Sequence, residues 1–200
     1  QTYDTGAFGQ MMEQGLKLAD WDGFAARAAE SKQRGLWRGL GIATFLEWTG
    51  GNALEENVNV RILSDGVIEV FSAVNQMGQG IATSLAQLVV DVFDVPLSQV
   101  RVVLGDTDRG NGFGSAGSRS LFTGGSAIRV GSAQALDQAR QLAGQALEAA
   151  PADLIYTQGQ FSVAGTDLKI GLAQLAQRQA QGRIEVDSKT AASGPSWPNG

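Results

Sequence analysis

Two neighbouring stretches of the chain alternate apolar and polar residues. The first runs from Val58 to Ile62 and the second from Ile68 to Val70, with Asp65-Gly66 between them. An Asp-Gly pair between alternating runs is typical of a β-hairpin. Alternation also predicts one buried and one solvent-exposed face, so we expect an antiparallel pair of strands.

Helical spacing of apolar residues marks four other stretches. It predicts helices over residues 8–19, from Trp21 onwards, over 80–94, and in a long segment after Arg119. Asp20 is the expected N-cap of the second helix. We expect the first two helices to form a hairpin packed on a sheet.

The remaining apolar runs are short and predict strands at 39–48 and 100–104. Beyond Pro151 we expect three short strands and a short helix, at residues 154–156, 161–163, 168–170 and 172–179. Gly182 is the expected end of that helix. The pattern as a whole predicts an α+β fold with antiparallel-rich sheets flanked by helices.

The stretch Asn75-Gln76-Met77-Gly78-Gln79-Gly80 closes one strand and opens one helix. Its glycines have no Cβ, so the backbone can turn tightly and approach a ligand closely. Gln76 and Gln79 add amide donors and acceptors. The unpaired N–H groups of the helix start make such a turn suited to a phosphate or another anionic oxygen.

A second turn of this kind, Gly117-Ser118-Arg119-Ser120, precedes the long helix. Ser118 or Ser120 is expected to cap that helix. Hydroxyls, backbone N–H groups and one guanidinium at a helix start favour an anion. We therefore expect the two turns to share one ligand, facing a pyrophosphate from different sides.

Composition removes several classes of function. The 200 residues include no cysteine and no histidine, and the net charge is −5. These absences exclude a disulfide framework, a thiolate metal site and a self-sufficient Ser-His-Asp hydrolase. The acidic charge disfavours nucleic-acid binding, and no apolar run is long enough to span a bilayer.

A nicotinamide-dependent oxidoreductase is one alternative. Gly78-Gln79-Gly80-Ile81-Ala82-Thr83 is similar to a dinucleotide fingerprint, and Asp106 follows at the distance of a ribose-binding acid. The alternating strand before the turn argues against it, because a central parallel strand is apolar throughout. We interpret Asp106 and Asp108 as turn residues that close a strand.

Several motifs then follow one another in a fixed order: Gln76-Met77-Gly78-Gln79-Gly80-Ile81-Ala82-Thr83, Val95-Pro96, Val100-Arg101-Val102, Gly105-Asp106-Thr107-Asp108 and Gly117-Ser118-Arg119-Ser120. Their order and spacing resemble the molybdenum-binding subunit of the xanthine dehydrogenase/aldehyde oxidase family. The resemblance is strongest to its bacterial aldehyde and carbon-monoxide dehydrogenase-like branch, and it covers essentially the whole chain.

The resemblance implies a molybdopterin cofactor with molybdenum, often as the cytosine dinucleotide, and hydroxylation of an aldehyde or N-heterocycle with oxygen from water. It implies partners too: the remainder of the large subunit, iron–sulfur and FAD domains or subunits, and a small-molecule substrate in the cytoplasm, with no nucleic acid and no membrane. The cofactor-binding residues it implies are Gln76, Met77, Gly78, Gln79, Gly80, Gly117, Ser118, Arg119 and Ser120.

The chain also departs from that family. It lacks the Gly-x-Gly-Glu motif that carries the family's base, so no catalytic residue is assigned and the fragment alone is expected to be inactive. A non-catalytic assembly domain of the same fold is the second alternative. The expected organisation is a helical lead-in (1–37), a cofactor-loop lobe (38–150), a small β/α extension (151–190) and a truncated linker (191–200).

Overall fold

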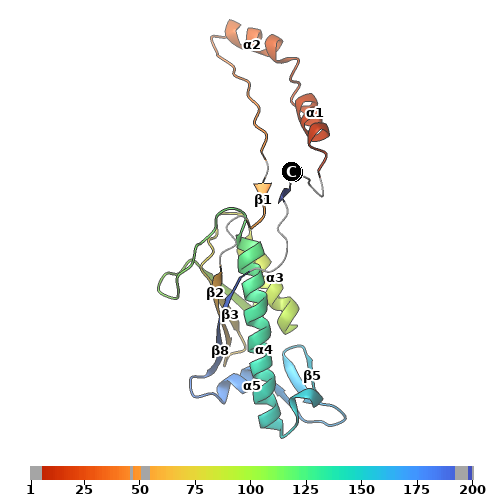
Figure 1. Cartoon of the computed structure of the whole chain (residues 1–200), viewed down its shortest axis with the longest axis vertical. Helices are drawn as coiled ribbons and strands as arrows, with labels where there is room; N and C mark the ends of the chain where they lie inside the picture. Colours follow the sequence, from red (N-terminus) through yellow and green to blue (C-terminus); the bar gives the residue numbers. More distant parts are fainter. Residues whose placement is uncertain (1–5, 46, 51–54, 192–197, 200) are drawn as a thin grey trace. The chain divides into compact units, whose positions relative to one another are not determined.

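The computed structural model describes residues 6–45, 47–50, 55–191 and 198–199. The chain divides into two compact units (Figure 1). One unit consists of residues 1–49 with 196–200, and the other of residues 50–195. The second unit contains both predicted glycine turns.

The first unit holds two helices and one short strand pair: α1 (Phe8–Leu18), α2 (Phe24–Gln33), and β1 (Glu47–Trp48) antiparallel to β9 (Pro198–Asn199). Both predicted helices are confirmed. Their expected packing on a sheet is not, because α1 contains no buried residue.

Two local predictions in this unit are wrong. The N-cap of α2 is Gly23, while Asp20 has a positive φ of 48° and pairs with Arg27 instead. The strand expected over 39–48 is reduced to Glu47–Trp48, because residues 39–45 are exposed and have no strand neighbour among the described residues. Alternating apolar residues form a strand only where a sheet edge accepts them.

The second unit is built on a four-stranded sheet of order β4-β3-β2-β8. Its strands are β2 (Glu56–Leu63), β3 (Ile68–Ser72), β4 (Val100–Leu104) and β8 (Arg183–Thr190). The β2–β3 hairpin is antiparallel, as predicted, and β3 runs parallel to β4. β8 was not predicted and pairs along the whole of β2.

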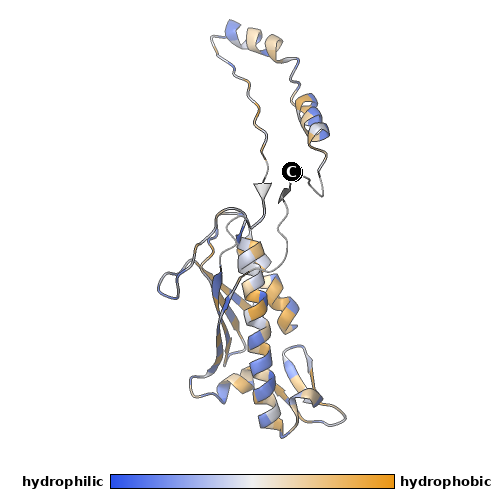
Figure 2. Ribbon diagram, in the orientation of Figure 1, coloured by the Kyte–Doolittle hydropathy of each residue, from blue (hydrophilic) through white to orange (hydrophobic). Residues whose placement is uncertain are grey.

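Helices cover one face of this sheet (Figure 1). They are α3 (Ile81–Phe93), α4 (Ser126–Leu147) and α5 (Leu172–Gln177). The short helical turns are η1 (Leu97–Gln99), η3 (Pro151–Asp153) and a π-helix, η2 (Ser120–Gly125), that leads into α4. Figure 2 shows α3 mainly hydrophobic and α4 mixed along its length, as expected for a helix with one buried side.

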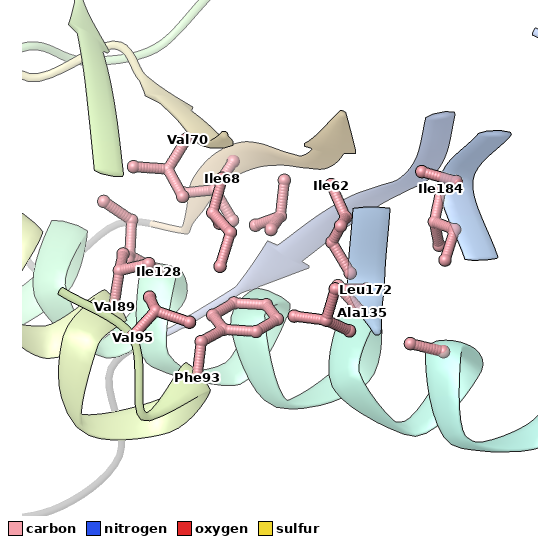
Figure 3. Packing of buried hydrophobic residues seen from close by; sticks show 14 of the residues in the cluster. Ile62, Ile68, Val70, Val89, Phe93, Val95, Ile128, Ala135, Leu172 and Ile184 are labelled. Atoms are coloured by element: carbon pink, nitrogen blue, oxygen red, sulfur yellow. The ribbon is translucent and has the colours of Figure 1, made fainter. Parts of the chain in front are cut away.

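The hydrophobic core lies between the sheet and these helices (Figure 3). Ile62, Ile68 and Val70 from the hairpin meet Phe93 of α3 and Ile128 of α4, and all five are at most 1% exposed. This packing holds the end of β3 and the start of α4 in place. The first glycine turn follows β3, and the second precedes α4 through η2.

The opposite face of the sheet is charged. Glu69 on β3 accepts a hydrogen bond from Arg101 (2.7 Å) and forms an ion pair with Arg109 (2.8 Å). Burial would raise the pKa of the Glu69 carboxyl, but these guanidinium groups outweigh it and lower the pKa. The predicted solvent-exposed face of β3 is therefore wrong, since every residue of the strand is buried.

A three-stranded antiparallel sheet completes the second unit: β5 (Leu154–Thr157), β6 (Gln160–Val163) and β7 (Lys169–Gly171). The three strands and the helix predicted beyond Pro151 are confirmed, but the prediction that Gly182 ends the helix is wrong, because α5 ends at Gln177 with Arg178 as its C-cap. The Tyr156 hydroxyl donates a hydrogen bond to the Phe93 carbonyl (2.6 Å), which joins this sheet to the end of α3. Across the described residues, every helix is too short or too polar for a membrane span.

Candidate functional site

The turn Gln76–Gly80 lies on the surface between β3 and α3. Gly78 and Gly80 have positive φ angles of 87° and 75°, a conformation that residues with a Cβ rarely adopt. A Cβ built on either glycine would meet no atom within 4 Å. Space for a ligand therefore remains directly over the backbone of the turn.

The two glutamines of the turn have different tasks. Gln79 closes it: its Oε1 accepts the Met77 N–H (2.5 Å) and its Nε2 donates to the Asn75 carbonyl (2.9 Å). Gln76 caps α3, because its Oε1 accepts the Ala82 N–H (3.1 Å). The side-chain amide nitrogen of Gln79 is therefore already bonded, whereas that of Gln76 has no partner among the described residues.

The backbone of this turn also presents donors. Among the described residues, no acceptor is bonded to the N–H groups of Gly80, Ile81 and Thr83. They belong to the first turn of α3, where the helix dipole favours negative charge. The site thus offers neutral donors to an anionic or carbonyl oxygen.

The second turn, Gly117–Ser120, is less open than its sequence suggested. Arg119 is 0% exposed, and its guanidinium donates to Glu56 and to the Gly114 carbonyl. The Ser120 hydroxyl donates inward to Ser115 Oγ (2.6 Å). Exposed groups of the turn are those of Gly117 and Ser118, which both have positive φ angles, of 56° and 54°.

The expectation that Ser118 or Ser120 caps the long helix is wrong. The chain first forms the π-helix η2, whose N-cap is Arg119 without a side-chain cap hydrogen bond. The N-cap of α4 itself is Gly125. The wider coil packs tightly, because a Cβ on Gly124 would lie 3.0 Å from Val74.

The structure brings the two turns together through Ser115. Its hydroxyl oxygen accepts the Asn75 N–H (2.8 Å) and the Ser120 hydroxyl (2.6 Å), and its own proton goes to the Asn75 carbonyl (3.1 Å). Gly114 lies beside this junction, since a Cβ there would be 2.7 Å from Asn75 Oδ1. One serine therefore links the start of the first turn to the end of the second.

Sequence reasoning missed the residues that organise this junction: Glu56, Asn75 as an anchor, and Ser115. Glu56 is 63 positions from its partner Arg119, and no local pattern connects them. Ser115 stood in a glycine-rich stretch that predicts a loop but not its contacts.

The acidic pair after β4 behaves as turn residues. Asp106 Oδ1 accepts the Asp108 N–H (3.0 Å), an arrangement that closes an Asx-turn. Within the described residues, no group of three or more acidic, histidine or cysteine side chains is placed to hold a metal ion. The described residues therefore give a cradle of backbone and amide donors, not a metal-ligand set.

Comparison with known proteins identifies the family of the chain. A family model described as the molybdopterin cofactor-binding domain matches residues 14–199. The chain belongs to this family. This match favours a molybdopterin-binding domain over the nicotinamide-binding alternative for the chain as a whole.

The chain is also similar to individual members of the family. This chain is 31% identical over 175 residues to the 6-hydroxypseudooxynicotine dehydrogenase complex subunit gamma of Paenarthrobacter nicotinovorans, and the match covers 87% of this chain and 22% of that protein. It is 26% identical over 187 residues to the nicotine 6-hydroxylase large subunit of the same organism, covering 87% and 23%.

Among solved structures, a reconstituted CO dehydrogenase from Oligotropha carboxidovorans has the same fold, with a TM-score of 0.66 at 23% identity over 98% of this chain and 27% of that one. This chain spans less than a quarter of the length of the two curated relatives named above. The α+β fold and the recognised family are both confirmed.

Proposed function

We propose that the turns Gln76–Gly80 and Gly117–Ser120 form one cradle for the molybdopterin cofactor in a subunit of a molybdenum hydroxylase. The observation that carries this proposal is the junction at Ser115, which holds the two turns against each other. Two anion-suited turns joined in this way favour one shared ligand.

The donor set fits such a cofactor. The open N–H groups of Gly80, Ile81 and Thr83 suit a phosphate or a pterin carbonyl, and Gln76 Nε2 adds a side-chain donor. The bare Cα atoms of Gly78 and Gly80 allow an approach that a Cβ would block. Gln79 then serves the site by closing the turn.

The bound cofactor would supply the molybdenum centre at which a carbon is hydroxylated with oxygen from water. The chain's own residues bind and orient that group. The names of two relatives specify nicotine and 6-hydroxypseudooxynicotine, so we propose an N-heterocycle as substrate, with an aldehyde as the alternative class. The proposed cofactor form is the cytosine dinucleotide.

The remaining machinery is proposed to lie on other parts of the complex. The base would come from the remainder of the large subunit, and the iron–sulfur and FAD groups from partner domains or subunits. This chain has no cysteine with which to bind a cluster. We therefore propose that it contributes cofactor binding and no catalytic residue.

The test is elemental and nucleotide analysis of the full-length protein, purified with its native partners from cells that make the cofactor. Molybdenum near one per large subunit, with release of CMP, is the expected result. Absence of both would favour a non-catalytic assembly domain of the same fold and would contradict the proposal.

A further inference from the structure

We infer that the buried ion pair between Glu56 and Arg119 is a positioning device that sets the two cofactor turns at their working separation. This inference rests on the proposed function, and it assigns a role to two residues that need not touch the cofactor. Its basis is the way a single carboxylate holds both segments of the cradle.

The pair lies fully inside the second unit. Arg119 Nη2 is 2.9 Å from Glu56 Oε2, and both side chains are 0% exposed. The same guanidinium donates through Nη1 to the Gly114 carbonyl (2.7 Å) and lies 5.4 Å from the centre of the Phe113 ring. Arg119 therefore contacts the loop that contains Ser115 and holds it in place.

The other oxygen of Glu56 holds the first segment. Its Oε1 accepts the Ser72 hydroxyl (3.0 Å) and the Ala73 N–H (3.1 Å), just before the chain enters the Gln76–Gly80 turn. One carboxylate oxygen of Glu56 thus binds the end of β3, and the other binds Arg119. Moving the carboxylate would change the exit of β3 and the entry to η2 together.

Stability alone is a poor explanation for this arrangement. Removing two charges from water is costly, and apolar residues of similar volume often stabilise a core as well or better. A guanidinium fork bonded to both a carboxylate and a carbonyl specifies one geometry, because its donors have fixed directions. The pair is therefore suited to holding two segments in one arrangement.

Close backbone packing makes that arrangement restrictive. A Cβ on Gly112 would lie 2.4 Å from the Ala73 side chain, so the glycine-rich loop runs directly against the end of β3. Ser115 adds the second link, to Asn75. Ser115 and Glu56 thus hold the part of the loop next to the first turn, and Glu56 provides the buried contact.

The test uses the full-length enzyme with its partners and compares Glu56→Gln with Phe161→Leu. Glu56→Gln keeps the side-chain shape but replaces the carboxylate that faces the guanidinium with a neutral amide. Phe161 is also 0% exposed, but it lies on β6 in the small sheet, so its substitution destabilises the same unit away from the cradle. Both proteins are followed by hydrogen exchange and by the rate at which molybdenum and CMP are lost on buffer exchange.

For Glu56→Gln we expect faster hydrogen exchange in both 75–80 and 109–119, with loss of molybdenum and CMP accelerated at least tenfold. Phe161→Leu should raise exchange in 154–171 and leave the loss rate within twofold of wild type. Arg119→Lys retains the charge without the fork, so it should reproduce the Glu56→Gln result even if that variant does not accumulate.

Wild-type loss rates in either Glu56→Gln or Arg119→Lys would overturn the inference. Equal acceleration in Phe161→Leu would also overturn it, because the pair would then act only through general stability. A wild-type enzyme without molybdenum or CMP would instead contradict the proposed function, so the two failures are distinguishable.

Discussion

Gly80→Ala tests the cradle most selectively, because the chain contains a matched control. Gly80 and Gly165 both have a φ of 75°, and a Cβ on either would meet nothing within 4 Å. Gly80 lies in the proposed cradle, whereas Gly165 lies in the turn between β6 and β7. The two substitutions therefore introduce the same methyl group at the same φ angle.

The structural cost of both changes follows from that conformation. An L-residue in the left-handed region costs about 1–2 kcal/mol, and neither methyl group adds a clash in the free protein. We expect equal destabilisation of the two variants within a few tenths of a kcal/mol. Only at Gly80 would the methyl group occupy the space over the open N–H groups of α3.

The assay is the molybdenum and CMP content of the full-length enzyme, with its resistance to loss on buffer exchange. Gly80→Ala should lower retention at least tenfold, equivalent to about 1.4 kcal/mol of binding free energy. Gly165→Ala should behave as wild type. Equal retention in the two variants would refute the placement of the cofactor over this turn.

Three further substitutions test separate parts of the account. Gln79→Ala removes both hydrogen bonds that close the first turn, so hydrogen exchange in 75–80 should rise and molybdenum content should fall; unchanged exchange would contradict the assigned role of Gln79. Glu185 is partly buried, which would raise its pKa, but Asn59, Arg183 and Arg61 outweigh this and lower the pKa from 4.5 to about 2. Its ion pairs should therefore stabilise the fold above pH 4.5 and lose that effect as the pH falls towards 2, so the difference in denaturant midpoint between wild type and Glu185→Gln should be present at pH 7 and vanish at low pH. A difference that is constant with pH would contradict it. Tyr156→Phe removes the bond to the Phe93 carbonyl and should cost about 1 kcal/mol in chemical denaturation, and no loss would show that this bond is not stabilising.

Much of the second unit could be predicted because its signals are local. Asp65-Gly66 set the β2–β3 hairpin, and the Asp65 carboxylate accepts the Val67 N–H (3.0 Å) in that turn. The glycines of the first turn marked the transition from strand to helix, and the structure places it between Ser72 and Ile81. Such patterns work because turn geometry depends on a few adjacent residues.

The missed features depend on residues distant in sequence. β8 contains the alternating pair Ile184 and Val186, yet its residues pair with residues of β2 that lie at least 120 positions earlier in the chain. The full burial of β3 arises because Arg109, from a later loop, covers Glu69 and Phe71. The alternation of apolar and polar residues along the sequence cannot indicate such a contact.

The candidate site divides in the same way. Glycine turns and helix starts were visible in the sequence, but the partners of their side chains were not. Arg119 looked like a phosphate ligand next to a helix start, and the structure gives its guanidinium to Glu56 and Gly114 instead. Whether the predicted residues bind the cofactor remains a prediction that the substitutions above address.

An experimental structure of the cofactor-loaded full-length enzyme would show whether both turns hold one molybdopterin cofactor. We expect cofactor oxygens within hydrogen-bond distance of the N–H groups of Gly80, Ile81 or Thr83, and contacts from Gly117–Ser118 to the same molecule. A cofactor bound elsewhere, or one that touches only one of the two turns, would show that the turns do not form one cradle.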